Sequence, residues 1–445
     1  MKRKMVLAIM TVLAFFFGTL WTSPVKVNAE TYQRSFVSVA RGAGPALFYQ
    51  PLFSGARSHI GILIMHPSAD YLGHPAAIQL AARGYTVLAV NSTYSHDNLV
   101  DFDGLLLQVR DAVKYLRTVP EITKVVLLGH SGGGPTMAAY QNIAQNGVGA
   151  CRGQEKIVEC PDSLAGMPAA DGLILLDTVL GMGAQVLVTL DPAVVTETSG
   201  TVLLPWLDMY NPQNGFHPPT GGTYSPAFIQ RFAAHQMTRM AKLVQTALDR
   251  LSKIKANGGR FTDDEPFDVP GGTITAPQIW SLDTRLWKQT RKAHPLVKAD
   301  GSVVTQIVKS LRNPSPVTSS PSLTTSGARF TTVRRFLNSW ACRATEQYGY
   351  GEDFITGIDW KSTYNNTPGS IEGVTVPTLV VGMSASSLVV SNETAFDHAV
   401  SSDKTIVYIE GATHMTFPIK PEFGDTVKTT FDYLDGWLSK PGRFK

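Results

Sequence analysis

Cysteine and clustered basic charge are both scarce in this chain. Its 445 residues include only three cysteines, and 39 Lys+Arg against 35 Asp+Glu give a formal net charge of +4. Charges of both signs are interspersed, and no run of lysine or arginine is present to bind nucleic acid. The sequence therefore gives no indication of a nucleic-acid partner.

Sequence motifs for metals and nucleotides are also missing. The ten histidines include no HExxH motif and no pair at metal-ligand spacing. G-x-x-x-x-G-K-[ST] is absent, and no G-x-G-x-x-G accompanies the glycine-rich turn discussed below. We therefore expect neither a metal nor any other cofactor.

Residues 1–29 have the pattern of a signal peptide. Lys2-Arg3-Lys4 is basic, Met5 to Leu20 is apolar, and Val27-Asn28-Ala29 places small residues before a cleavage site. The apolar run is shorter than the ~20 residues that a transmembrane helix needs. We expect export to the periplasm or the medium, with no membrane anchor after cleavage.

The cysteines agree with export. Cys151 and Cys160 flank a short polar loop, and closing it with a disulfide would stabilise the fold by about 2–3 kcal/mol. Cys342 then has no partner and is expected to be a buried apolar residue.

Buried strands alternate with helices over much of the chain, which predicts a mostly parallel, doubly wound α/β sheet. An antiparallel pair is expected within 35–60, and function is expected at the carboxyl ends of the parallel strands. The predicted buried strands are 61–65, 85–90, 125–128, 172–176, 374–382 and 405–410, and the predicted helices include 75–82, 101–118 and 425–438.

The alternation stops between about 190 and 370. This stretch holds a long helical segment from Ser225 to Lys255 and a polar, proline-punctuated loop at 313–327, expected to be mobile. We interpret residues 191–370 as an inserted, mainly helical cap. The catalytic core would then consist of 30–190 and 371–445.

A glycine-rich turn follows the strand at 125–128. Gly129-His130-Ser131-Gly132-Gly133 satisfies G-x-S-x-G between a strand and a helix. A serine at such a turn has strained backbone and an exposed hydroxyl at a helix N-terminus, where free N–H groups stabilise an oxyanion. Ser131 is therefore the predicted nucleophile.

Three features together resemble the α/β-hydrolase superfamily, in particular an exported, esterase- or lipase-like serine hydrolase with a large cap. They are the serine turn, the His66-Pro67 turn after an earlier strand, and Gly411-Ala412-Thr413-His414 after the last strand. The resemblance covers roughly 36–190 and 374–440. Residues 191–370 resemble no family that we can name.

The resemblance implies roles for further residues. His414 would be the general base, because it follows the last strand in the family order of serine, acid and histidine. The oxyanion would be held by the N–H groups of Gly132 and of Ser68, since Pro67 has none; Ala69 is the next choice after Ser68. His130, next to the nucleophile, is expected to be structural.

The acid departs from the family pattern. The loop after the strand that ends at Gly382 contains no carboxylate, whereas the acid most often lies there in the family. A family variant places it after the preceding strand, where Asp177 stands. Asp177 is our first choice, with Glu393 and Asp397 as the alternatives.

The function predicted from these residues is the hydrolysis of carboxylic esters through an acyl-enzyme on Ser131. The partner would be a small-molecule or polymeric ester, and the sequence does not indicate which one, nor the oligomeric state. An acyltransferase or exopeptidase with the same triad is an alternative. A non-catalytic binding protein on this scaffold is another.

Overall fold

The structure is a computed structural model that describes residues 31–198, 203–273, 277–318 and 327–445. The expected signal peptide at 1–29, and residues 319–326 of the loop expected to be mobile, lie outside the described residues.

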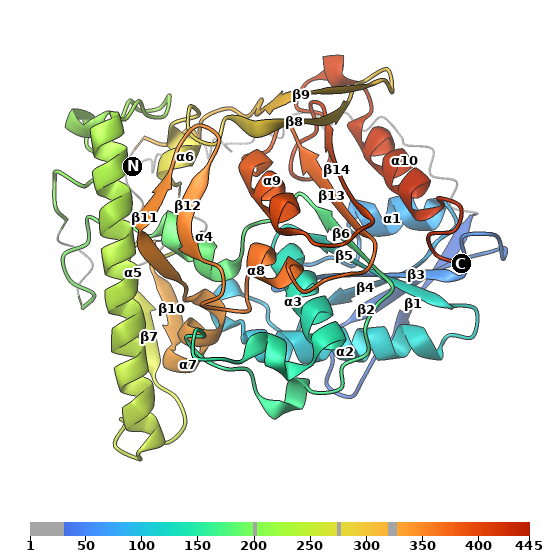
Figure 1. Cartoon of the computed structure of the whole chain (residues 1–445), viewed down its shortest axis with the longest axis horizontal. Helices are drawn as coiled ribbons and strands as arrows, with labels where there is room; N and C mark the ends of the chain where they lie inside the picture. The colour runs from blue at the N-terminus through green and yellow to red at the C-terminus, as the bar shows by residue number, and fades with distance from the viewer. Residues whose placement is uncertain (1–30, 199–202, 274–276, 319–326) are drawn as a thin grey trace, which may run out of the picture.

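A ten-stranded sheet forms the centre of the molecule (Figure 1). Six neighbouring strands, in the order β4-β3-β5-β6-β13-β14, are parallel. The expected antiparallel pair, β1 and β2, lies at one edge of this core, with β2 antiparallel to β4. These eight strands are β1 (Tyr32–Val37), β2 (Ala46–Pro51), β3 (Ile60–His66), β4 (Thr86–Asn91), β5 (Lys124–His130), β6 (Gly172–Leu176), β13 (Thr378–Met383) and β14 (Lys404–Ile409).

Helices cover both faces of the sheet, as the alternating pattern predicts. α1 (Pro75–Ala82) and α10 (Thr426–Leu438) pack on one face. α2 (Phe102–Thr118), α3 (Gly133–Asn146), α8 (Thr367–Ile371) and α9 (Val389–His398) lie on the other (Figure 1). The helix expected at 101–118 is confirmed, and its buried side chains form the predicted stripe: Phe102, Leu105, Leu106, Val109, Val113 and Leu116.

The parallel strands bring three chain segments to one edge of the sheet. In the register, His66 at the end of β3 is opposite Asn91, and His130 at the end of β5 is opposite Leu176 of β6. The turn with Ser131, the turn with Asp177 and the loop after β3 therefore start from the same edge.

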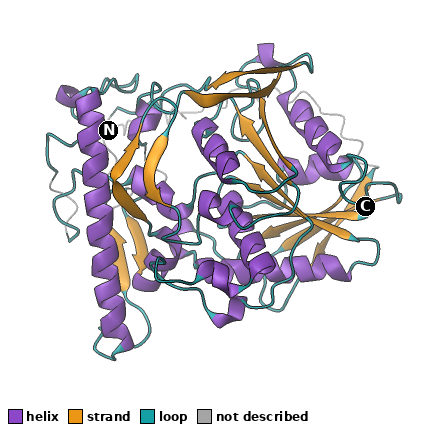
Figure 2. Cartoon of the chain, viewed as in Figure 1, coloured by secondary structure: helices purple, strands orange, loops and turns teal. Residues whose placement is uncertain are grey.

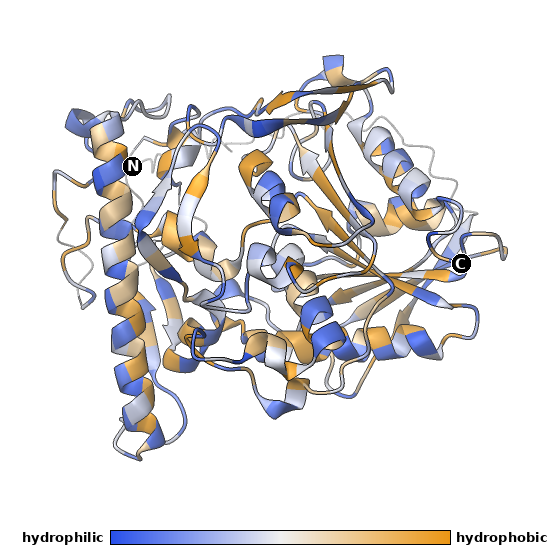
Figure 3. Ribbon diagram, in the orientation of Figure 1, coloured by the Kyte–Doolittle hydropathy of each residue, from blue (hydrophilic) through white to orange (hydrophobic). Residues whose placement is uncertain are grey.

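The segment between β6 and β13 contains strands as well as the long helix. α5 (Pro226–Lys255) begins as expected, because the Ser225 side chain caps it by accepting a hydrogen bond from the Phe228 N–H at 3.2 Å. Hydrophobic and hydrophilic residues are interspersed along the length of this helix (Figure 3). The described residues of this segment also form six strands, which the interpretation as a mainly helical cap did not include (Figure 2). They are β7 (Pro266–Val269), β8 (Gln289–Val297), β9 (Val303–Lys309), β10 (Arg329–Thr332), β11 (Arg343–Tyr350) and β12 (Ile355–Asp359), and the remaining helices are α4 (Met182–Thr189), α6 (Ile279–Leu282) and α7 (Val333–Arg335).

Two of these strands belong to the central sheet. β8 pairs in parallel with β14, and β9 pairs antiparallel with β8 at the outer edge. β7 and β10 form one small separate sheet, and β11 and β12 form another that contacts α5. The inserted segment is therefore continuous with the core through β8.

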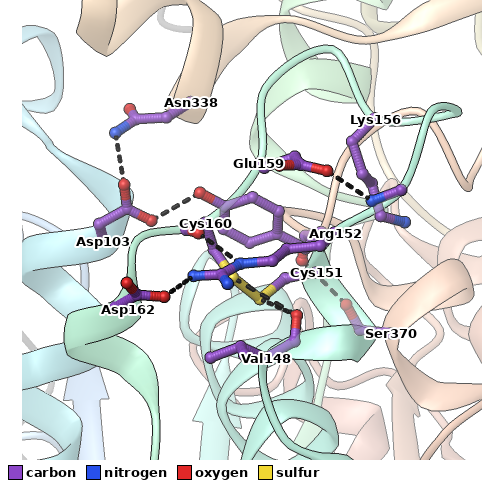
Figure 4. The surroundings of a disulfide bond; sticks show 12 residues. Asp103, Val148, Cys151, Arg152, Lys156, Glu159, Cys160, Asp162, Asn338 and Ser370 are labelled. Atoms are coloured by element: carbon purple, nitrogen blue, oxygen red, sulfur yellow. Dashed lines mark hydrogen bonds and ion pairs between the residues drawn. A yellow bond between two sulfur atoms is a disulfide. The ribbon is translucent and has the colours of Figure 1, made fainter.

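The predicted disulfide is present. Cys151 and Cys160 are bonded with a Cα–Cα distance of 5.6 Å, and the Arg152 Nε–H donates to the Cys160 carbonyl at 2.9 Å (Figure 4). Cys342 is free and buried, and burial raises the pKa of its thiol to about 12. A thiol with so high a pKa is a poor nucleophile.

No helix within the described ranges combines the length and the apolar character needed to cross a membrane.

Candidate active site

Ser131 lies on a strained turn between β5 and α3. Its φ is 56°, a left-handed conformation that costs a residue with a side chain about 1–3 kcal/mol. The Ser131 N–H donates to the Leu176 carbonyl at 3.2 Å, which ties the turn to the end of β6.

The two glycines of the motif are required by close backbone contacts. A Cβ on Gly129 would lie 2.5 Å from the Gly133 carbonyl oxygen, and a Cβ on Gly133 would lie 2.5 Å from the Met65 carbonyl oxygen. Any side chain at either position would push β5, α3 and β3 apart. The local sequence thus produces the turn expected for an exposed serine nucleophile.

His414 and Asp177 are in direct contact. The Nδ1 atom of His414 is 2.6 Å from Oδ2 of Asp177, which is fully buried, whereas the His414 side chain is 38% exposed. Ser131 and His414 line the same cavity. The structure therefore brings together the serine, the histidine and the first-choice acid.

The other two candidate acids lie elsewhere. Glu393 accepts hydrogen bonds from the backbone N–H groups of Arg291 and Lys292 at 2.7 and 2.8 Å, and it is 2.8 Å from the Nε2 atom of His294. Asp397 pairs with the Lys292 ammonium group at 2.8 Å. Both carboxylates therefore hold β8 against α9, and neither touches His414.

The second oxygen of Asp177 has its own donors. Oδ1 accepts from the Asn392 side-chain amide at 2.9 Å and from the Met383 N–H at 3.2 Å. The Asn392 side-chain oxygen also accepts from the Thr178 N–H at 3.0 Å, so Asn392 fixes both the Asp177 carboxylate and the backbone turn that carries it. Asp177 itself has a positive φ of 45°. Asn392 was not predicted as a site residue, because it lies within α9, 215 residues from Asp177, and no sequence motif marks it.

His130 connects the loop after β3 with the loop that carries His414. The Tyr71 hydroxyl is 2.6 Å from Nδ1 of His130, and Nε2 of His130 is 2.8 Å from the His414 carbonyl oxygen. A hydroxyl that donates to Nδ1 leaves the proton on Nε2 for that carbonyl. Burial lowers the pKa of His130, so the ring is neutral. His130 was predicted to be structural, but its partner Tyr71 was not identified.

Replacing Tyr71 with phenylalanine should lower both stability and turnover. It leaves the buried Nδ1 of His130 without a donor, which costs about 1–3 kcal/mol, and it loosens the backbone that carries His414. Tyr49→Phe is a matched control, because its hydroxyl also bonds this loop, at the Leu72 carbonyl (2.7 Å), without touching His130. The midpoint temperature of thermal unfolding should fall in both variants, whereas kcat should fall only in Tyr71→Phe. Equal kcat values in the two variants would contradict the proposed link between Tyr71, His130 and the His414 loop.

The expected oxyanion donors have different surroundings. Gly132 is the N-cap residue of α3, where the first N–H groups have no acceptor within the helix. The Ser68 N–H instead donates to Nδ1 of His66 at 3.2 Å, and the Ala69 N–H donates to the same atom at 3.0 Å. Ser68 also lines a different cavity from Ser131. The choice of Ser68 therefore conflicts with the geometry, because both candidate amides of this loop are engaged.

The cavity at Ser131 has a volume of about 540 Å³. One wall comes from the core, including Val179, Leu388 and Thr413, and the other comes from the inserted segment. The inserted wall consists of Pro277, Gln278, Trp280, Ser281, Arg312, Asn313 and Ser315. Across the described residues, no group of three or more His, Cys, Asp or Glu side chains is arranged to hold a metal.

The strand order and the positions of these residues define an α/β-hydrolase fold. Ser131 follows β5, Asp177 follows β6 and His414 follows β14, in the chain order serine, acid, histidine. The fold expected from the resemblance is thus present, with β8 and β9 as additional strands.

No family model and no curated protein matches the chain. Among solved structures it is similar to brefeldin A esterase, a bacterial homologue of human hormone sensitive lipase, at 10% identity and a TM-score of 0.43, over 98% of this chain and 81% of that one. A soluble variant of monoglyceride lipase from Saccharomyces cerevisiae matches at 13% identity and a TM-score of 0.41, over 94% and 98%. Carboxyl esterase 2 from the mycorrhizal fungus Tuber melanosporum matches at 11% identity and a TM-score of 0.42, over 94% and 89%.

Proposed function

We propose that this chain is a serine hydrolase that cleaves carboxylic esters. The observation that carries the proposal is the convergence of Ser131, on its strained turn, with the His414–Asp177 pair at one cavity. A serine hydroxyl becomes a useful nucleophile only when a base removes its proton.

The proposed reaction has two halves. Ser131 Oγ attacks the ester carbonyl while the Nε2 atom of His414 takes the hydroxyl proton, and His414 then gives that proton to the departing alcohol. Water, activated by the same nitrogen, releases the acid from the acyl-enzyme. The buried Asp177 carboxylate accepts the Nδ1–H of His414 throughout, which fixes the tautomer and stabilises the imidazolium.

The inserted segment is proposed to select the substrate. Trp280 and Arg312 stand on the wall of the cavity that belongs to this segment, whereas Ser131, His414 and Asp177 belong to the core. Variation in that wall would alter which acyl or alcohol groups fit without changing the chemistry.

Export is also a proposal. It rests on the basic and apolar pattern of residues 1–29, and the disulfide between Cys151 and Cys160 is compatible with an oxidising compartment.

A fluorophosphonate probe and a set of p-nitrophenyl esters of increasing chain length test the proposed function. The folded protein should form one covalent adduct, and peptide mass spectrometry should locate it on Ser131. The esters should be hydrolysed much faster than the matching p-nitroanilide. The absence of an adduct would favour the binding protein, and comparable anilide cleavage would favour the exopeptidase. Faster product formation with an added alcohol acceptor would favour acyl transfer.

A further inference from the structure

The loop after β3 uses its backbone N–H groups on a side chain of its own. Nδ1 of His66, the last residue of β3, accepts hydrogen bonds from the N–H groups of Ser68 and Ala69 at 3.2 and 3.0 Å. Pro67, which lies between His66 and Ser68, has no N–H. The loop thus gives the oxyanion no free backbone donor from these three residues.

The same two hydrogen bonds fix the proton on the His66 ring. A nitrogen that accepts from two N–H groups carries no proton, so the hydrogen of the neutral imidazole is on Nε2. Burial lowers the pKa of His66 to about 4, which keeps the ring neutral at ordinary pH. Tyr71 stacks on the ring at a centroid distance of 4.9 Å and an interplanar angle of 18°, and this contact fixes the ring plane.

The Nε2–H group reaches the nucleophile turn. A Cβ built on Gly132 would lie 3.1 Å from Nε2 of His66, so this nitrogen stands directly against the residue after Ser131. No residue that the structure describes forms a hydrogen bond with this atom. His74 provides a contrast: its Nδ1 accepts from the Ala76 N–H, but its Nε2 is buried with no hydrogen-bond partner among the described residues. Nε2 of His66 is not sealed in this way, and His66 as a whole is only partly buried.

We propose that the His66 Nε2–H is the second oxyanion donor, beside the Gly132 N–H. This inference rests on the proposed function. When Ser131 Oγ bonds to the carbonyl carbon, the π electrons of the C=O bond move to its oxygen, which accepts one hydrogen bond from each donor. When the tetrahedral intermediate collapses, those electrons reform the C=O bond and expel the alkoxide, which His414 protonates. His66 keeps its proton throughout; a neutral imidazole with a fixed tautomer is an effective electrophile.

Two substitutions separate this role from a purely structural one. In His66→Asn, the side-chain oxygen takes the place of Nδ1 and still accepts from the Ser68 and Ala69 amides, but the donor at the Nε2 position is lost. In His66→Gln, the amide nitrogen takes the place of Nε2 and keeps the donor, but the acceptor at the Nδ1 position is lost.

The asparagine variant should lose about 10²–10³-fold in kcat with little change in KM, the usual effect of removing one oxyanion donor. Its rate of phosphonylation by the fluorophosphonate should fall in parallel. The glutamine variant should retain kcat within about tenfold of the wild type, although its loop is less stable. Equal losses in the two variants, or the larger loss in His66→Gln, would overturn the proposal.

A measurement on the wild type keeps the test valid if a variant does not fold. In protein with ¹⁵N-labelled histidine, the Nε2–H resonance of His66 should move downfield when a trifluoromethyl ketone forms its anionic hemiketal on Ser131. An unmoved resonance with the ketone bound would overturn the inference and leave the proposed function intact. If the wild type neither turns over esters nor reacts with the probe, the proposed function itself fails.

Discussion

Replacing Ser131 with alanine will lower kcat for ester hydrolysis by about a millionfold, the scale observed when a serine nucleophile is removed from a triad. The size of the effect follows from the proposed mechanism: without Oγ no acyl-enzyme would form, and His414 and the oxyanion donors would have only water to assist. The fold should be unaffected. Serine and alanine both carry a Cβ, so the substitution adds no steric contact at the strained backbone with φ 56°.

The measurement is kcat with the best ester of the p-nitrophenyl series, together with thermal unfolding. Ser439→Ala is a suitable control, since Ser439 follows α10 and its exposed hydroxyl donates a hydrogen bond to the Asp435 carbonyl at 2.7 Å, far from Ser131 in the sequence. If the Ser131 variant keeps more than a few per cent of the wild-type rate, a different residue is the nucleophile.

Asp177→Asn should reduce kcat by up to ~10⁴ while KM changes little. An asparagine that presents its amide nitrogen to Nδ1 favours the tautomer with the proton on Nε2, so His414 can no longer accept the Ser131 proton. The lost carboxylate also no longer stabilises the imidazolium. Asn392 can still pair with the remaining oxygen, since it donates to Oδ1 of Asp177 at 2.9 Å.

Glu393→Gln is the matched control for Asp177→Asn, because Glu393 is also buried and is bonded to a histidine, His294. Its loss should lower the thermal unfolding midpoint, since it anchors Arg291 and Lys292 of β8, and should leave kcat nearly unchanged. A fall in kcat for Glu393→Gln as large as for Asp177→Asn would mean that the effect comes from destabilised structure and not from orientation of the imidazole.

Local sequence was sufficient to predict the parts of the site that depend on neighbouring residues. The turn at Ser131 has no room for a side chain at positions 129 and 133, and the motif of five consecutive residues, Gly129 to Gly133, already shows glycine at both. The choice of Asp177 came instead from the family resemblance: a variant of the α/β-hydrolase pattern places the acid after the strand that precedes the usual one, and Asp177 directly follows that strand. Asp177 can reach His414 because the strands that precede these two residues, β6 and β14, lie on either side of β13 in the sheet.

Two of the contacts that the sequence did not reveal join residues far apart in the chain, with no motif to mark them. Tyr71 and His130 are 59 residues apart, and Asn392 and Asp177 are 215 apart, so neither pair leaves a periodic pattern. Ser68 was chosen on the assumption that a loop amide is free, and the side chain of His66 competes for that amide. A hydrogen bond from a backbone amide to a nearby side chain depends on the side-chain rotamer, which a sequence does not display.

The pairing of β8 with β14 bears on how the inserted segment can be exchanged or removed. Deletion of 191–370 would remove β8 and β9 and leave the unpaired edge of β14, the strand that leads into the His414 loop, open to pairing with another molecule. An engineered protein that exchanges the parts of the insertion that line the cavity at Ser131 should therefore keep residues 289–309 from the original chain. With those two strands retained, the remainder of the insertion becomes a replaceable module, and β14 stays paired with β8.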